Sequence, residues 1–527
     1  MDTTDHEHYV TSNDTPYVVR LIKLLKDSII AGGGEVFYIV VIYVTNLILS
    51  RSMGPGGVGV YAQATGIVLF VIMIARIGLE GSVLRYVSIY FGRQDFRHIR
   101  GLILFSVAAI LVTSTVLGGG TFFLADEISI KLFHEPQLGC VLRFFALTIP
   151  LMAATAILLN AIQGFQRVDT RVYIDRIITP TVRAVLLAMF LYVGLGWQGV
   201  ILAVLLTALV ATALSYRSFY SLWYGFESTT GKAGLWSTKD AAWNVSEWMQ
   251  FSFPLLLSSI SAFAIDRMPT LVLAHFEVSS AVGIFDIVTK LALLVQFPLV
   301  VSNTIFAPMI GEMWAKKNLA DLEATFKIVT KWVFTSSLFI FFVLALSARP
   351  ILNVFGPEFD AGMSAFLILS LGQLVNASTG AVGWLLIMTG YANLHLVNSA
   401  LLAVTTLVFT YYATPHFGIL GPALAMGLAV IIVNLLRLAE VFYIHKIHPY
   451  RWDFIKPFGS ACIAVGMVVL VSPDKLLRSL PEFWGYMAKG ILFGLVFILL
   501  LIIFRFEGEE KELLRLVAQK FRSSSRA

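Results

Sequence analysis

The stretch SAFAIDRMPTLVLAH, from Ser261 to His275, contains the main features of the fold. Almost every residue in it is apolar, yet Asp266 and Arg267 are adjacent in its middle and Pro269 follows. An apolar run of roughly 20 residues is long enough to cross about 30 Å of hydrocarbon. A charge inside such a span is costly against lipid, so it tends to face a cavity or a partner. We therefore expect a membrane-spanning helix whose charges face an internal aqueous cavity.

Similar apolar runs recur along the 527 residues, which are 58% hydrophobic and 13% charged. Soluble domains carry about 25% charged residues. The pattern predicts an all-α polytopic membrane protein of about 14 transmembrane helices. The expected spans are residues 28–49, 58–80, 101–124, 143–163, 177–195, 199–222, 250–273, 281–306, 330–348, 361–388, 395–413, 419–444, 456–472 and 485–505.

Basic residues concentrate in alternate connections between these spans. The connections at 194–199 and 274–280 contain no Lys or Arg, whereas those at 85–100, 167–176 and 316–331 contain several. Since positive charge marks the cytoplasmic side, both termini are expected in the cytoplasm of a multi-pass plasma-membrane protein. The net charge of +6 is explained by topology, so no nucleic-acid partner is expected. Cys140 and Cys462 are far apart and predict neither a disulfide nor a metal site.

The chain also repeats itself. VGVYA at 58–62 returns as VGIFD at 282–286, and FGRQDF at 91–96 as WAKKNL at 314–319, among five such matches at offsets of 222–226 residues. Six spans are an even number, so the two copies are predicted to be parallel repeats. The predicted organisation is a cytoplasmic segment 1–27, repeats 28–222 and 250–444 joined by an interfacial linker 223–249, two additional helices in 445–505, and a cytoplasmic amphipathic tail 506–527.

Several motifs resemble those of a known family. RSMGPGGVGVYA (Arg51–Ala62), AVGIFDIVTKLALL (Ala281–Leu294) and PMIGEMWAKKNLADL (Pro308–Leu322) are similar to motifs of the polysaccharide transporters, or O-antigen flippases. That family belongs to the multidrug/oligosaccharidyl-lipid/polysaccharide exporter superfamily, and the resemblance covers about residues 28–450. It implies a flippase that translocates polyprenyl-diphosphate-linked oligosaccharide from the inner to the outer leaflet by alternating access, for cell-surface polysaccharide biosynthesis.

Two other functions stay open. A cation-coupled multidrug or metabolite antiporter of the same superfamily would have an acidic cavity, whereas a basic cavity favours the flippase. A membrane-embedded glycan ligase or polymerase would usually carry a large external loop, and every predicted external connection here is short. We therefore expect no enzymatic activity, no cofactor beyond Na⁺ or a proton as coupling ion, and no metal site.

Charges within the spans supply the candidate site residues. Arg267 and Lys290 lie on neighbouring spans, roughly 10–15 Å from the outer ends of those spans at helical rise. Both are expected to bind substrate. Asp266 and Asp286 are candidates for ion coupling, because Pro269 cannot donate a hydrogen bond to Ile265 and leaves a carbonyl beside Asp266. Asp286 and Lys290 are four apart, on one helical face. The alternative is a structural ion-pair cluster that locks the two spans together.

Arginines near the predicted cytoplasmic face form a second group: Arg76, Arg183 and Arg437. A guanidinium binds phosphate oxygens through a two-pronged fork, so these residues can receive an entering diphosphate. Arg51 is a candidate for contacting the head group after translocation. The alternative for the three near-cytoplasmic arginines is that they reach to the interface, with Glu440 one turn from Arg437; Arg51 can equally be an interfacial anchor.

Overall fold

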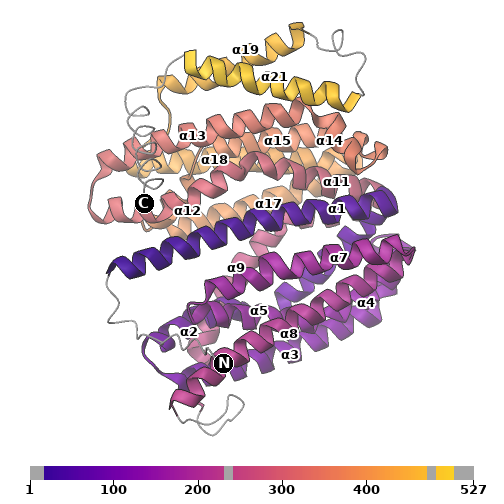
Figure 1. Ribbon diagram of the computed structural model, residues 1–527, viewed down its shortest axis with the longest axis vertical. Helices are drawn as coiled ribbons and strands as arrows, with labels where there is room; N and C mark the ends of the chain where they lie inside the picture. Colours follow the sequence, from indigo (N-terminus) through magenta and orange to yellow (C-terminus); the bar gives the residue numbers. More distant parts are fainter. Residues whose placement is uncertain (1–16, 231–240, 472–481, 504–527) are drawn as a thin grey trace, which may run out of the picture. The chain divides into compact units, whose positions relative to one another are not determined.

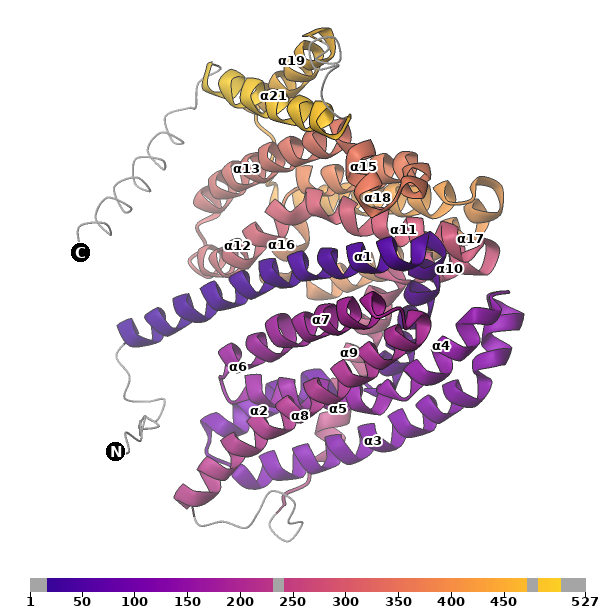
Figure 2. The same ribbon diagram turned by 45° about the vertical axis from the view of Figure 1, so that its right-hand side comes forward.

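The computed structural model describes residues 17–230, 241–471 and 482–503, and every regular element in these ranges is a helix (Figure 1; Figure 2). The predicted all-α class is thereby confirmed. The chain divides into two compact units, Met1–Gly283 and Ile284–Ala527. The predicted amphipathic tail at 506–527 and most of the N-terminal segment 1–27 lie outside the described residues. The proposed repeat of six spans stays a prediction.

Unit 1 is a bundle in which α3, α5 and α8 pack side by side, with α7 between α1 and α8 (Figure 1; Figure 2). Two of its elements, η1 and η2, are π-helical segments that continue directly from or into α-helices. Its elements are α1 (Tyr17–Ala75), α2 (Leu79–Gly92), α3 (Phe96–Glu127), η1 (Ile128–Leu132), α4 (Pro136–Ala146), α5 (Thr148–Gly164), α6 (Val168–Val172), η2 (Tyr173–Ile178), α7 (Thr179–Tyr192), α8 (Gly196–Thr230), α9 (Val245–Asp266) and α10 (Met268–Phe276).

The first helix, α1, is two helices joined at a kink. Its 59 residues would measure about 88 Å if straight, far more than a bilayer requires. Gly54 interrupts it with φ 67° and ψ −174°, a conformation that glycine adopts without steric cost. Pro55 follows and has no backbone N–H to continue the hydrogen-bond ladder. The kink lies between the predicted spans 28–49 and 58–80.

Unit 2 is built around α18, which packs against both α15 and α17. A short 3₁₀ segment, η3, interrupts the first long helical stretch of this unit before Pro298. Its elements are α11 (Ser279–Ala292), which begins at the unit border, η3 (Leu293–Gln296), α12 (Phe297–Ala315), α13 (Leu319–Leu346), α14 (Ala348–Phe355), η4 (Pro357–Gly362), α15 (Met363–Ser378), α16 (Val382–Met388), α17 (Ala392–Phe417), α18 (Leu420–His445), η5 (Trp452–Phe454), α19 (Ile455–Val471) and α21 (Glu482–Ile503).

The two last described helices, α19 and α21, pack on α13 within unit 2 (Figure 2). The Phe339 ring stacks with those of Phe493 and Phe497 at centroid distances of 6.3 and 6.1 Å. In η5, which directly precedes α19, Asp453 Oδ2 is 2.7 Å from Lys331 Nζ of α13. An aromatic layer and a buried ion pair therefore attach this helical pair to the unit.

Ten described helices are long and apolar enough to cross a membrane, or eleven if the α4–α5 pair, bent by 46°, counts as one span. The difference from fourteen has three sources. The kinked α1 contains two predicted spans, α7 has 14 residues, and the apolar part of α21 is the short stretch Ala488–Ile503. The chain is a multi-pass membrane protein, and the count of fourteen stays a prediction.

Candidate functional site

A group of charged side chains lies at the end of unit 1 that is predicted to face the cytoplasm. Arg76 follows the last residue of α1, and its Nη1 donates to Glu80 Oε2 at 2.9 Å. The two side chains are 24% and 30% exposed, so the pair is partly withdrawn from solvent. The predicted phosphate ligand therefore already has a carboxylate partner one turn away.

Arg171 in α6 belongs to this group, although the sequence did not single it out as a ligand. Its Nη1 donates to Asn160 Oδ1 at 3.1 Å and also to Gln163 Oε1, both on α5. Burial lowers the pKa of the Arg171 guanidinium below its ordinary value, and Asp175 opposes that shift. An arginine nevertheless stays charged in proteins. Within the described part of the chain, no carboxylate lies within ion-pair distance of Arg171, so neutral amides hold its charge.

Further charges surround Arg171. Arg176, in the π-helical η2, places Nε 3.2 Å from Glu35 Oε2 on α1 and 3.6 Å from Asp175 Oδ2. Its guanidinium also lies over the Tyr38 ring at 4.6 Å. Glu80, Asp175, Arg76 and Arg176 all interact electrostatically with Arg171. We call this set the arginine cluster: Arg76, Arg171 and Arg176 with Glu35, Glu80 and Asp175.

The other predicted arginines lie apart in their contacts. Arg183 is a partly buried residue of α7, and its Nε has no hydrogen-bond partner among the described residues. Arg51 is exposed on α1, three residues before the Gly54 kink. In unit 2, Arg437 donates to Ser399 Oγ at 3.2 Å, while Glu440 accepts from Asn398 at 2.5 Å. Each of the two residues therefore has its own hydrogen-bond partner, while Glu440 still interacts electrostatically with Arg437.

The charged pair in SAFAIDRMPTLVLAH lies at a helix break. α9 ends at Asp266 and α10 begins at Met268, with Arg267 between them at φ −119°. The break falls where Pro269 cannot donate to the helix, as the sequence predicts. Asp266 is exposed and Arg267 is partly exposed. The break thus holds a carboxylate and a guanidinium side by side at the junction of two helices.

Asp286 and Lys290 form the predicted pair one turn apart on α11. Lys290 Nζ is 2.5 Å from Asp286 Oδ2, and the two side chains are 23% and 6% exposed. The (i, i+4) prediction is confirmed. A close, shielded pair of this kind supports the structural reading of Asp286, because the carboxylate is already neutralised by its neighbour.

Unit 2 also contains a chain of amide side chains that the sequence analysis did not identify. Asn434 Nδ2 donates to Asn376 Oδ1 at 3.0 Å, and Asn376 Nδ2 donates to Gln296 Oε1 at 3.1 Å. Gln373 accepts a longer bond of 3.4 Å from Asn376. Gln296 closes the 3₁₀ segment η3, so the amide chain joins η3 to α15 and α18. The signal available in the sequence was one or two amides on each of several apolar helices.

Among the described residues, no group of His, Cys, Asp and Glu side chains is placed to hold a metal ion. The described helices, with arginines, amides and carboxylates held inside apolar bundles, define a polytopic membrane protein with a polar interior. The chain belongs to the polysaccharide biosynthesis protein family, whose model matches residues 24–314.

Two characterised sequences are similar to this chain. Stage V sporulation protein B of Bacillus subtilis (strain 168) is 21% identical over 418 residues, which cover 76% of this chain and 80% of that protein. The capsular polysaccharide biosynthesis protein CapF of Staphylococcus aureus is 24% identical over 196 residues. That second match covers 37% of this chain and 48% of CapF.

Solved structures share the fold. The lipid II flippase MurJ in an inward closed conformation matches with a TM-score of 0.68 at 15% identity, covering 91% of this chain and 98% of MurJ. An inward-facing multidrug resistance MATE family transporter of the MOP superfamily matches with a TM-score of 0.62 at 14% identity, covering 80% and 98%. At these identities the likeness shows the fold alone.

Proposed function

We propose that the chain is a flippase that moves a polyprenyl-diphosphate-linked oligosaccharide from the inner to the outer leaflet of the cell membrane by alternating access. In this proposal it serves cell-surface polysaccharide biosynthesis, acts without enzymatic chemistry, and keeps both termini in the cytoplasm. Membership in the polysaccharide biosynthesis family supports the proposal, as does a fold shared with a protein named a lipid II flippase.

The observation that carries the proposal is the environment of Arg171. Its charge is partly buried, and its hydrogen bonds go to the neutral oxygens of Asn160 and Gln163. A diphosphate offers several anionic oxygens, and the guanidinium fork binds such oxygens strongly where water is scarce. Arg76 and Arg176 can exchange their present carboxylate partners for phosphate oxygens. The arginine cluster would then receive the diphosphate on the cytoplasmic side.

In this proposal the remaining predicted ligands bind the diphosphate at later stages of translocation. Arg183, which has a guanidinium nitrogen without a hydrogen-bond partner among the described residues, and Arg267, at the α9–α10 break, provide further positive charge in unit 1. Lys290 provides it in unit 2. Arg51, exposed beside the α1 kink, would contact the head group in the outer leaflet.

Ion coupling belongs to the same proposal. Asp266 and Asp286 would bind Na⁺ or a proton, with the gradient driving return of the empty carrier. The position of Asp266 at a helix break supports this role, because unpaired backbone carbonyls at a break can coordinate cations. Because Asp286 is already in close contact with Lys290, we expect it to contribute less to ion coupling than Asp266 does.

The test is transport by the purified full-length protein in liposomes. A polyprenyl-diphosphate disaccharide with a labelled sugar is incorporated, and its arrival in the opposite leaflet is followed by an impermeant sugar-oxidising enzyme. We expect protein-dependent movement of the diphosphate-linked sugar and none of a free disaccharide. Na⁺- or proton-driven movement of a cationic dye, without movement of the lipid-linked sugar, would instead establish the antiporter.

A further inference from the structure

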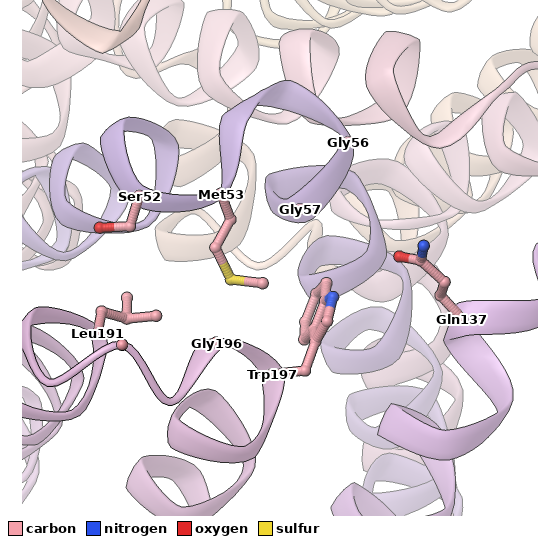
Figure 3. A pocket seen from close by; sticks show the side chains of 9 residues that line it. Ser52, Met53, Gly56, Gly57, Gln137, Leu191, Gly196 and Trp197 are labelled. Atoms are coloured by element: carbon pink, nitrogen blue, oxygen red, sulfur yellow. The ribbon is translucent and has the colours of Figure 1, made fainter.

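A cavity of about 460 Å³ lies within unit 1 beside the kink of α1, and Arg76 of the arginine cluster follows the far end of that helix. Its walls come from the kink of α1, the turn between α7 and α8, and the start of α4. Figure 3 shows Met53 and the Trp197 indole extending toward one another beside the Gly56–Gly57 turn, with Gln137 approaching from α4. The lining residues are Ser52, Met53, Gly56, Gly57, Gln137, Leu191, Gly194, Gly196 and Trp197.

The lining has the chemistry of a site for a neutral ring with many hydroxyl groups. Trp197 offers a broad apolar face and one N–H donor, and Gln137 offers both an acceptor and donors. α8 begins at Gly196, and the first N–H groups of a helix have no partner within it. None of the nine lining residues is charged. A sugar ring matches this set, because its C–H face packs on an indole while its rim hydroxyls bond to amides and backbone.

Glycines keep the cavity open. A Cβ placed on Gly56, Gly194 or Gly196 would meet no atom within 4 Å, so these residues border empty space. Gly194 and Gly196 also have φ of 83° and 52°, which only glycine adopts easily, and they shape the α7–α8 turn that carries Trp197. The volume lies in the range of small-molecule sites, about 300–1,000 Å³. The backbone of α1 and that of the α7–α8 turn therefore both leave this space open.

We propose that this cavity binds one sugar ring of the translocated glycan on the outer side of the membrane. The proposal rests on the flippase function proposed above, and it adds a second site to it. Gly54, at the kink of α1, and Arg76, just after the end of α1, are 22 positions apart in sequence. At the rise of an α-helix this separation corresponds to roughly 30 Å. A diphosphate at the arginine cluster cannot place its first sugar here. The cavity therefore holds the glycan in a later, outward state, while Arg51, next in sequence to Ser52, contacts the head group.

The experiment measures sugar binding to the full-length protein in nanodiscs. Methyl glycosides of glucose, galactose, N-acetylglucosamine and N-acetylgalactosamine are screened by saturation-transfer NMR. We expect at least one glycoside to bind, with transfer strongest at the C–H protons of one ring face. Trp197→Ala and Gly56→Leu should weaken that binding at least tenfold. The first variant removes the indole, and the second fills the open space without a backbone clash.

Matched controls separate the site from general damage. Tyr192→Ala removes an aromatic side chain that is 93% exposed on the neighbouring turn, and Gly120→Leu changes a helical glycine of α3 that also borders open space. Both should bind the glycoside as the wild type does. Equal binding by Trp197→Ala and wild type would overturn the proposal. The proposal would also be overturned if no glycoside binds the wild type, while a polyprenyl monophosphate binds it and Gly56→Leu abolishes that binding.

Liposome transport separates failure of this site from failure of the proposed function. If lipid-linked sugar moves normally in Trp197→Ala and no glycoside binds the wild type, the flippase stands and the outer sugar site is wrong. If glycoside binding depends on Trp197 but no lipid-linked sugar moves, the site stands and the flippase is wrong.

Discussion

Both units place polar side chains among apolar helices, but they use different chemistry to do so. In unit 1 the arginine cluster concentrates full charges, three guanidinium groups among three carboxylates. In unit 2 the amide chain from Gln296 through Asn376 to Asn434 links neutral groups by hydrogen bonds of 3.0–3.1 Å. Each amide there bonds to another amide, so the chain is largely satisfied by itself.

The difference indicates a division of roles. A buried charge is stable only with partners, and replacing those partners by an incoming anion changes the energy of the site by a large amount. A satisfied amide network gains little from binding a ligand and instead fixes the packing of its helices. We therefore expect unit 1 changes to alter transport first, and unit 2 changes to alter stability first.

The largest effect is expected from Arg171→Ala. Removing the guanidinium should reduce liposome transport of the diphosphate-linked sugar at least 100-fold, equivalent to about 2.7 kcal/mol. Arg171→Lys should retain an intermediate rate, because an ammonium keeps the charge but lacks the two-pronged fork.

Arg217→Ala serves as the matched control, since Arg217 is an exposed arginine of α8 near the same predicted face. It should transport at the wild-type rate. If the Arg171→Ala protein folds normally and transports at the wild-type rate, the proposed division of roles between the two units is wrong.

The second effect concerns the close charge pair of Asp286 and Lys290 at the start of unit 2. Asp286→Asn leaves Lys290 without its nearest carboxylate and should lower stability by about 2 kcal/mol. This is less than a fully buried pair would lose, because Lys290 keeps 23% exposure. The double variant Asp286→Asn/Lys290→Gln should lose less than the sum of the single changes.

Thermal unfolding and ion-stimulated transport are measured on the same preparation. A structural pair gives non-additive losses of stability with unchanged ion dependence. Full stability together with loss of ion stimulation in Asp286→Asn would assign the residue to coupling instead.

A third test breaks the amide chain at its centre. Asn376→Leu removes the acceptor of Asn434 and a donor to Gln296, and an amide left unsatisfied in a buried position costs roughly 1–2 kcal/mol. Thermal unfolding should shift downward, while transport per folded molecule stays near that of the wild type. Loss of transport without loss of stability would show that the amide chain, too, belongs to the substrate path.

Sequence patterns predicted the fold class well, because span length and charge bias reflect the bilayer directly. The Asp286–Lys290 contact was also predictable, since both residues lie on one helical face. Arg437 and Glu440 are even closer in sequence, only three positions apart, yet Glu440 accepts a hydrogen bond from Asn398 of another helix. Local spacing decides a contact only where no tertiary partner competes for it.

Arg171 shows the other limit of the sequence. It lies in a segment rich in positive charge, which the positive-inside rule assigns to a cytoplasmic loop. The structure makes that segment helical and turns Arg171 toward Asn160 and Gln163. Topology rules report the side of the membrane but say nothing of which loop charges fold back into the bundle.

The smallest expected effect tests how closely the arginine cluster is positioned. Gly34 of α1 faces α6, and a Cβ at this position would lie 2.4 Å from Val172 Cγ1. The valine side chain is stiff at χ1, so Gly34→Ala should push α6 away from α1. Arg171 precedes Val172, and Glu35 follows Gly34, so both sides of the cluster would shift. We expect transport to fall about threefold to tenfold, roughly 1 kcal/mol.

Two further variants isolate the cause of that loss. Gly33→Ala makes the same change one residue earlier, where a Cβ meets nothing within 4 Å, and should transport normally. Val172→Ala removes the clashing methyl, so Gly34→Ala/Val172→Ala should recover most of the wild-type rate. Recovery would show that transport depends on where α6 holds Arg171 relative to α1. If the double variant stays as slow as Gly34→Ala, the position of α6 is not the cause, and the charges of unit 1 act without depending on a close fit between α1 and α6.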